Sequence, residues 1–478
     1  AAQRGCEGKT ESKGREKESA WAVGGDMYKF RRDQVLDPEF LTKLVERFKK
    51  EYVPRFIRDQ QYYEVKTEIL KRTMTDGKPN NRLAHGFCRY ITNMATSYFA
   101  GKPLGYIVED NEYQEALENL FQRNYIDSLN FAVSKEASKK GIGFLLMFLN
   151  EKGDLRIKKM DAETIIPVYS SSLDEFLEAA VHIWEDYDID NTLLCEYADV
   201  YDDTFIYHFK RENGVKNYTP MPENPKEAHL MGDIPVIVFW NNEEQQGDYE
   251  PHTSLVDAYD KAQSDTGNDM EYFTDAYLWI KGASEIVEAA LTGEDGEGDG
   301  ARAVRDFRKN KLLMLDENGQ AGWLVKNVND TATENYKNRL YKDIFFLAQV
   351  PALSDESFAG NLSGIAIKYK LIGVEELALM KENCFRSAQT KLIRMLTEYL
   401  NTKMNKDWDP DSVEQKYERN FIDNDADIIS NARQVEGIVS HETQLGMLPG
   451  SIVDDAQEEL LRIRQEAADE EQIPMAVV

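Results

Sequence analysis

Two helical patterns joined by one loop, between residues 331 and 404, constrain the fold of this chain more than any other stretch. Before the loop, apolar residues recur at steps of four and three, which is the period of an α-helix. These residues are Tyr336, Leu340, Ile344, Leu347 and Val350. Pro351 ends the pattern, because proline removes a backbone donor and disfavours helical geometry in the preceding residue.

The second pattern, over residues 365–404, predicts a very long helix with one apolar face. At about 1.5 Å per residue this helix would span roughly 60 Å. A helix of that length needs other helices to cover its apolar face, and Gly373 gives it a place to bend. The simplest interpretation is a helical hairpin within a large core, with a hinge at Gly373.

The composition excludes several classes of protein. The chain has 478 residues, of which 42% are hydrophobic and 30% charged, so it can bury a sizeable core and form more than one domain. No apolar run reaches the ~18 residues that a membrane span needs. Its four cysteines stand far apart without CxxC spacing, which argues against a disulfide framework or a zinc site. The net charge of −29 disfavours tight binding of nucleic acid, because that affinity comes from neutralising phosphates.

The first 26 residues differ from the rest of the chain. They are rich in Gly, Lys, Glu and Ser and contain few apolar residues. We expect residues 1–26 to be a disordered or non-native extension, with Met27 as the true start. Gly8-Lys9-Thr10 resembles the end of a phosphate-binding loop, but Gln3 stands where the first glycine of that loop belongs.

The sequence pattern over residues 27–250 predicts an α+β region. Asp37-Pro38 is a typical helix start, and helical patterns cover 38–63 (interrupted near Pro54), 82–100, 111–123 and 127–140. Aromatic and β-branched residues then alternate with short polar turns, as in antiparallel sheet. The predicted strands are 144–149, 155–160, 165–169, 179–184, 193–200, 205–209 and 234–240.

A further long helix is predicted over residues 254–280. Its apolar residues step by three and four and resemble a coiled-coil seam. They are Leu255, Tyr259, Ala262, Thr266, Met270, Phe273, Tyr277 and Ile280. Short strands are expected around 311–315 and 323–328, inside a small insert, and two C-terminal helices near 425–440 and 452–471.

Catalytic and metal-binding motifs are weak. The sequence contains no HExxH, GxSxG or GxxxxGK[ST] motif, and its six histidines share no metal spacing. The stretch from Asp295 to Asp306 half matches a calcium loop, but its third position is Glu297, its eighth is Arg302 and its last carboxylate is the shorter aspartate. An acidic loop without a cation is the simpler interpretation. We therefore expect no enzyme activity, cofactor or metal.

The order of these parts, together with several short motifs, resembles one family. An α+β region is followed by a long helix, a small insert, a returning helix, a loop, a very long helix and C-terminal helices. The motifs, in order, are Asn81-Arg82-Leu83, Gly101-Lys102-Pro103, Ile234-Pro235, Phe239-Trp240-Asn241-Asn242, Gly247-Asp248-Tyr249-Glu250, Leu255-Val256-Asp257-Ala258-Tyr259, Ser264-Asp265, Phe358-Ala359-Gly360-Asn361 and Ser363-Gly364. Over about residues 28–470 the chain resembles the portal proteins (head–tail connectors) of tailed double-stranded-DNA bacteriophages of the siphophage type.

The resemblance implies a portal fold, α+β in class, with a wing, a helical stem, a small α/β clip, a long kinked helix and a helical crown. The implied parts are a wing over 27–253, stem helices over 254–280 and 331–350, a clip over 281–330, a tunnel loop over 351–364, the long helix and wing return over 365–420, and a crown over 421–478. The residues implied to face DNA are Ser354, Asp355, Glu356, Ser357, Phe358, Ala359, Gly360, Asn361, Leu362, Ser363 and Gly364. The apolar residues from Leu255 to Ile280 would form the stem interface between subunits.

The resemblance also implies a ring, usually of twelve subunits, at one capsid vertex of the virion, assembled in the host cytoplasm. Double-stranded DNA would pass through this ring during packaging and ejection without sequence readout. The implied partners are terminase, head-completion or adaptor proteins, and the major capsid and scaffolding proteins, with no membrane. Two alternatives remain: an oligomeric structural or scaffolding protein without a DNA channel, and an enzyme whose carboxylate site is assembled only in space.

Overall fold

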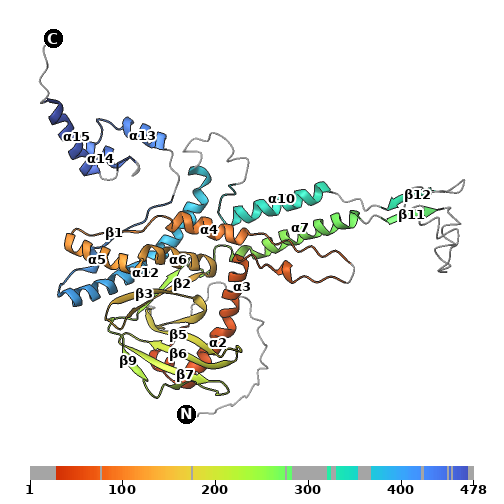
Figure 1. Cartoon of the computed structure of the whole chain (residues 1–478), viewed down its shortest axis with the longest axis horizontal. Coiled ribbons are helices and arrows are strands. Elements are labelled where there is room, and N and C mark those ends of the chain that lie inside the picture. The colour runs from red at the N-terminus through yellow and green to blue at the C-terminus, as the bar shows by residue number, and fades with distance from the viewer. Residues whose placement is uncertain are drawn as a thin grey trace, which may run out of the picture. The chain divides into compact units, whose positions relative to one another are not determined.

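The computed structural model describes residues 28–75, 78–173, 176–274, 277–281, 320–324, 330–353, 368–420, 425–448, 452–453 and 456–471. The chain divides into two compact units (Figure 1). The first unit contains Ala1–Tyr63, Cys88–Pro251 and Ala348–Val478, and the second contains Glu64–Phe87 and His252–Leu347. The implied N-terminal extension and tunnel loop from residue 354 lie outside the described residues, as does most of the implied clip.

The first unit is built on two antiparallel sheets. The larger sheet has the strand order β4-β5-β6-β7-β8, with β9 also paired to β7, and the smaller has the order β10-β2-β3. The strands are β2 (Ile142–Leu149), β3 (Leu155–Met160), β4 (Ile165–Tyr169), β5 (Leu177–Tyr187), β6 (Leu193–Tyr201), β7 (Phe205–Glu212), β8 (Thr219–Pro220), β9 (Lys226–Ala228) and β10 (Val236–Trp240). The seven predicted strands are therefore confirmed, most with longer ends.

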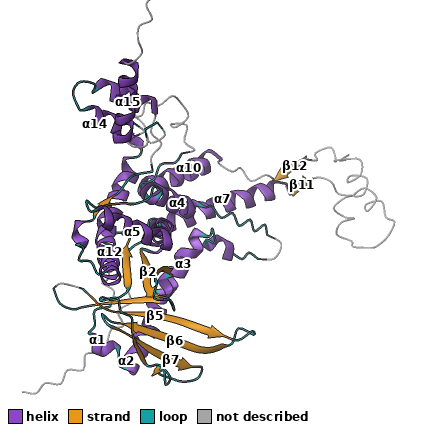
Figure 2. Cartoon of the chain, turned by 60° about the vertical axis from the view of Figure 1, so that its left-hand side comes forward, coloured by secondary structure: helices purple, strands orange, loops and turns teal. Residues whose placement is uncertain are grey.

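Helices cover these sheets (Figure 2). They are α1 (Arg32–Val35), α2 (Pro38–Glu51), α3 (Val53–Tyr63), α4 (Phe87–Ala100), α5 (Asn111–Asn124), α6 (Ile126–Lys140) and α12 (Ile372–Met404). The carboxylate of Asp37 caps α2 by accepting a hydrogen bond from the Phe40 amide at 2.9 Å, as the Asp-Pro start predicts. A short two-stranded sheet, which the sequence pattern did not predict, joins β1 (Gly105–Ile107) to β13 (Glu414–Lys416).

Strand β2 is almost wholly apolar because it is buried on both of its faces. Phe144 and Leu146 belong to the cluster that contains α2 and the larger sheet. Leu145 and Met147 belong to a second cluster, which contains α5, α6 and α12. Successive side chains of a strand point to opposite faces, so a strand covered on both faces needs no polar alternation. The core of the first unit thus has two apolar layers that share strand β2.

The predicted long helix is interrupted near its start: residues 368–370 are helical, and residues 365–367 lie outside the described residues. Helix α12 begins at Ile372, after a break at Leu371, whose backbone φ and ψ are −93° and 0°. Gly373 lies in the first turn of α12, and a Cβ there would come within 2.9 Å of the Gln349 carbonyl oxygen. This close approach gives the glycine a packing role, while the hinge at Gly373 stays a prediction.

The C-terminal helices are α13 (Asp425–Gln434), α14 (His441–Gly446) and α15 (Ala456–Glu471). The predicted helix over 425–440 was too long, because α13 ends at Gln434, and α14 was not predicted. The prediction over 452–471 corresponds to α15. With helices and antiparallel sheets in separate layers, the predicted α+β class is confirmed.

Candidate functional site

The second unit is organised around two helices. Helix α7 (Thr253–Thr274) and helix α10 (Asp330–Leu347) run side by side (Figure 1). Strands β11 (Tyr277–Lys281) and β12 (Gln320–Leu324) pair antiparallel between them in the sequence. The predicted helix over 254–280 is therefore wrong beyond Thr274. The segment Tyr277–Lys281 is aromatic and β-branched, so pairing with β12 favours it as a strand.

After Val256, the buried positions of α7 are polar. Asp260 and Ser264 are completely buried and Asn268 is 6% exposed. The carboxylate of Asp260 accepts hydrogen bonds from the His85 amide at 3.0 Å and the Thr67 hydroxyl at 2.6 Å. The hydroxyl of Ser264 accepts one from the Leu83 amide at 2.9 Å. Asn268 Oδ1 accepts one from the Asn81 amide at 2.7 Å. We call these three α7 residues the polar ladder.

Simple geometry explains the ladder. Four residues of a helix rise about 6 Å, and two residues of extended chain span about 6.6 Å. Side chains four apart on α7 can therefore bind backbone amides two apart on the segment 81–85. These amides belong to no sheet or helix, and buried amides without a partner are costly, so the ladder stabilises this segment. The motif Asn81-Arg82-Leu83 and the motif Ser264-Asp265 meet here.

The predicted apolar stripe lies largely outside this buried face. Leu255, Tyr259, Ala262 and Thr266 are half-buried, and Met270 is 67% exposed. The side chain of Phe273 lies outside the described residues. So do those of Tyr277 and Ile280, which belong to β11 rather than to the helix. The stripe is therefore an α7 surface from Leu255 to Met270.

Tyr259 of the stripe belongs to an aromatic cluster within this unit. The ring of Tyr259 lies 4.9 Å from that of His85 and 5.0 Å from that of Phe87. Phe87 in turn lies 5.7 Å from Phe345 of α10. Other α10 side chains remain open: Phe346 is 80% exposed and Tyr336 52%. Large apolar side chains are thus exposed on both helices.

A second polar centre lies buried in the first unit. Lys381 of α12 is 1% exposed, and its ammonium group donates hydrogen bonds to both carboxylate oxygens of Asp248, at 2.7 and 2.8 Å. It also donates one to Asn241 Oδ1, while Asn241 Nδ2 donates to Asp248 at 2.8 Å. The hydroxyl of Ser138 donates a further bond to Asp248. We call these four residues the lysine cluster.

Burial lowers the pKa of Lys381, and the charge of Asp248 opposes that effect. The cluster places the motifs Phe239-Trp240-Asn241-Asn242 and Gly247-Asp248-Tyr249-Glu250 against α6 and α12. Gly247 is required here, because a Cβ would lie 2.3 Å from the Lys139 carbonyl oxygen. This cluster therefore fixes the loop that precedes α7 in the chain. Sequence reasoning missed Lys381, for which no local pattern gave a signal.

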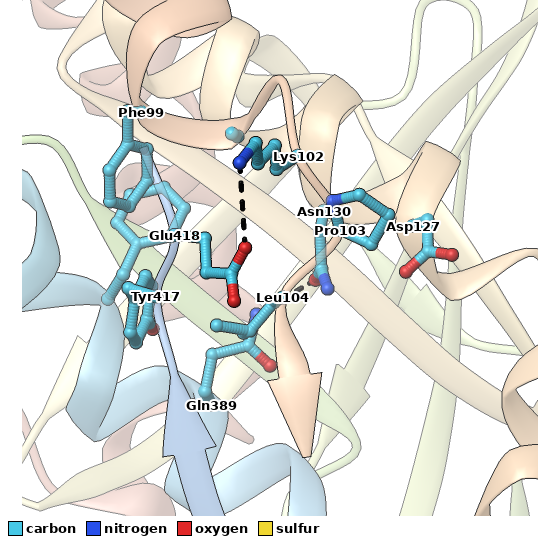
Figure 3. A pocket seen from close by; sticks show the side chains of 11 residues that line it. Phe99, Lys102, Pro103, Leu104, Asp127, Asn130, Gln389, Tyr417 and Glu418 are labelled. Atoms are coloured by element: carbon cyan, nitrogen blue, oxygen red, sulfur yellow. Dashed lines mark hydrogen bonds and ion pairs between the residues drawn. The ribbon is translucent and has the colours of Figure 1, made fainter. Parts of the chain in front are cut away.

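The motif Gly101-Lys102-Pro103 lines a small cavity (Figure 3). On one side Lys102 faces Glu418 at 3.6 Å, and Asp127 lies on the other. Beneath them Gln389 Nε2 donates to Asn130 Oδ1 at 2.8 Å, and Asn130 Nδ2 donates to the Tyr106 hydroxyl at 3.1 Å. The cavity volume is about 20 Å³, which holds about one water molecule. The site is too small for an organic cofactor.

The described residues give no sign of a metal centre. Among them, no group of three or more His, Cys, Asp or Glu side chains is placed to hold a metal ion. Nor does any described helix have the length and apolar character to cross a membrane. The tunnel-loop residues 354–364, which the resemblance assigns to DNA, lie outside the described part of the chain.

The described residues thus form an α+β first unit with C-terminal helices, and a second unit with two side-by-side helices. The family model for "Phage portal protein, SPP1 Gp6-like" matches residues 43–472, so the chain belongs to this phage portal family. It is 25% identical to the portal protein of Bacillus phage SPP1 over 457 residues, which are 91% of this chain and 87% of that protein. It is also 25% identical to the portal protein of Clostridium phage phiCD119 over 430 residues, 84% of this chain and 89% of that protein.

A solved structure titled "Neck of empty GTA particle computed with C6 symmetry" matches with a TM-score of 0.40 and 12% identity. That match covers 76% of this chain and 90% of the solved one. The resemblance to phage portal proteins that the motifs indicate is confirmed by the family model and by both curated relatives.

Proposed function

We propose that this chain is the subunit of a portal ring at one capsid vertex of a tailed phage. The ring would pass double-stranded DNA during packaging and ejection. The family membership over residues 43–472 supports this proposal most strongly. The expected number of subunits is twelve, as the resemblance implies.

The second unit supports a ring contact through α7. The polar ladder satisfies the buried face of this helix within the chain, so that face is not available to a neighbour. The stripe from Leu255 to Met270 is the apolar surface that α7 leaves partly exposed, and α10 adds Phe346 and Tyr336. Exposed apolar surface of this kind is typical of a protein interface. A neighbouring copy would cover it.

The negative net charge of the chain suits a channel through which DNA slides. A chain of net charge −29 neutralises few phosphates, so a duplex would slide past it without tight binding. Loop residues 354–364, with Asp355 and Glu356, would face that duplex. Terminase would dock at the clip and supply ATP hydrolysis, which this chain lacks the phosphate-binding motif to perform. Adaptor, capsid and scaffolding proteins would contact the assembled ring inside the virion.

Electron microscopy of the purified protein tests the ring. We expect rings with a central hole wide enough for a DNA duplex. Met270→Asp should shift the protein to small species in gel filtration, because a charge in the covered stripe would lack a partner and cost several kcal/mol, roughly 2–7, for each contact. Met74→Asp is the matched control, since Met74 is exposed in the same unit but lies off the stripe.

Filaments or monomers of the unaltered protein would instead favour a structural protein without a channel. Intact rings of Met270→Asp would refute the stripe as the interface while leaving the ring itself in place. Deleting residues 355–361 tests the loop: rings should persist, and the amount of DNA packaged into assembled capsids should fall sharply. Normal packaging with that deletion would reduce the loop to a connector.

A further inference from the structure

A broad groove lies in the first unit, whereas the helix pair that the proposed function uses belongs to the second. It is lined by α5, by the turn between β2 and β3, and by the last turns of α12. Its volume is about 700 Å³, which is in the range of a ligand or peptide site. The apolar lining consists of Ala116, Leu120, Leu155, Leu400 and Met404.

The charged lining of the groove is mainly basic. Arg123, Arg156 and Lys403 line it together with a single acid, Asp154. Such a balance is unusual in a chain of net charge −29. Arg123 and Arg156 are both exposed, and Arg156 Nη1 donates a hydrogen bond to the Arg123 carbonyl oxygen at 2.9 Å, which holds the Arg156 side chain beside the end of α5.

The third basic residue, Lys403, contacts Tyr399 on its own helix and Asp154 before β3. Lys403 Nζ donates to the Tyr399 hydroxyl at 2.8 Å, and that hydroxyl donates to the Gly153 carbonyl oxygen at 3.3 Å. Asp154 lies 3.5 Å from Lys403, at the long end of an ion pair. Both partners are substantially exposed, so this pair is weak and a second carboxylate can approach the ammonium group.

The groove therefore fits a segment that carries carboxylates followed by apolar side chains. Residues 469–478 of this chain have this pattern. Asp469, Glu470 and Glu471 are three consecutive acids, and the next seven residues are Gln472-Ile473-Pro474-Met475-Ala476-Val477-Val478. We propose that residues 469–478 dock in this groove, with the carboxylates against the three cations and the apolar residues on the apolar lining. The proposal is independent of the ring and of the DNA channel.

Cysteine cross-linking in the full-length protein tests this docking. Met404 lies in the groove and is 41% exposed, so the double variant Met404→Cys with Met475→Cys should form a disulfide under mild oxidation. Peptide mass spectrometry identifies the linked pair. The matched control is Met74→Cys with Met475→Cys, since Met74 is equally exposed (42%) but belongs to the second unit.

Charge reversal tests the chemistry. Adding Arg123→Glu and Arg156→Glu to the groove pair should lower the cross-linking yield about tenfold, because two attractive contacts become repulsive. Converting Glu470→Lys and Glu471→Lys in that same protein should restore the yield. Higher salt should also reduce it, since exposed charges are screened. Monomer-sized or dimer-sized products then show whether the segment comes from the same copy or another.

Three results would overturn the proposal. They are equal cross-linking yields for the Met404→Cys and Met74→Cys pairs, a yield that Arg123→Glu and Arg156→Glu leave unchanged, and a yield that Glu470→Lys and Glu471→Lys do not restore. Ring formation by the same variants, checked by microscopy, separates this outcome from the proposed function. Rings without the cross-link would refute the docking alone. Absence of rings from the unaltered protein, with the cross-link retained in the cysteine variant, would refute the portal ring alone.

Discussion

The lysine cluster of the first unit and the polar ladder of the second both bury polar groups, but they satisfy these groups with different kinds of partner. In the first unit Lys381 and Asp248 are opposite charges, both out of contact with water, that satisfy each other directly. In the second unit one carboxylate and two neutral side chains bind backbone amides. The first arrangement leaves an uncompensated buried charge when either partner is lost, whereas removal of a ladder side chain leaves unbound amide, hydroxyl or imidazole groups. The comparison predicts that single substitutions in the lysine cluster of the first unit lower stability more than substitutions in the polar ladder do.

The largest expected effect comes from Lys381→Met. This change strands the buried Asp248 carboxylate, so unfolding free energy should fall by about 3–5 kcal/mol in urea denaturation. Lys391→Met is the control, because Lys391 lies on the same helix and its partner Asp233 is 52% exposed. We expect a loss below about 1 kcal/mol there. Equal losses would mean that the burial of the pair is not what matters.

The acid response of the first unit should be the next largest effect. Burial raises the pKa of Glu136, but the ammonium groups of Lys140, Lys139 and Lys159 outweigh it and lower the pKa to about 2 from its ordinary 4.5. A lowered folded-state pKa contributes stability above pH 4.5 that is lost as the pH falls toward 2, here roughly 3 kcal/mol. Denaturation at pH 6 and pH 3 measures this change. In Glu136→Gln the difference between the two pH values should shrink by most of that amount.

A smaller and more local effect is expected from Asp260→Ala in the polar ladder. The His85 amide, the His85 ring nitrogen Nδ1 and the Thr67 hydroxyl lose their partner, which costs about 2 kcal/mol. Hydrogen exchange should show faster exchange at the amides of residues 81–85 while the first unit is unchanged. Asp265→Ala is the control, since Asp265 is 48% exposed in its pair with Arg72. Uniform acceleration across both units would contradict a local ladder.

Ser264→Ala should have the smallest effect. It removes one neutral acceptor from the Leu83 amide, so we expect a loss of about 1 kcal/mol and faster exchange mainly at that amide. Ser254→Ala, at an exposed position on the same helix, should change neither quantity. A loss from Ser264→Ala as large as that from Lys381→Met would remove the distinction between the two regions.

Local sequence determined much of the secondary structure. The period of three and four marked α10 and the body of α7, and the apolar run at 144–149 marked β2. Asp37-Pro38 marked the start of α2 correctly. These signals work because a helix or a strand repeats its buried face at a fixed interval. The order of the parts and the short motifs further indicated the portal family, which the family model confirms.

Only the tertiary structure decided which groups satisfy one another. Lys381 and Asp248 are 133 residues apart, and Asp260 and His85 are 175 apart, so no local period records either pair. The spacing of Asp260, Ser264 and Asn268 was present in the sequence, but their partner is an extended segment without a periodic signature of its own. Tertiary contacts also determine where α7 ends. The apolar steps continue to Ile280, yet pairing with β12 satisfies the backbone of Tyr277–Lys281 as a strand.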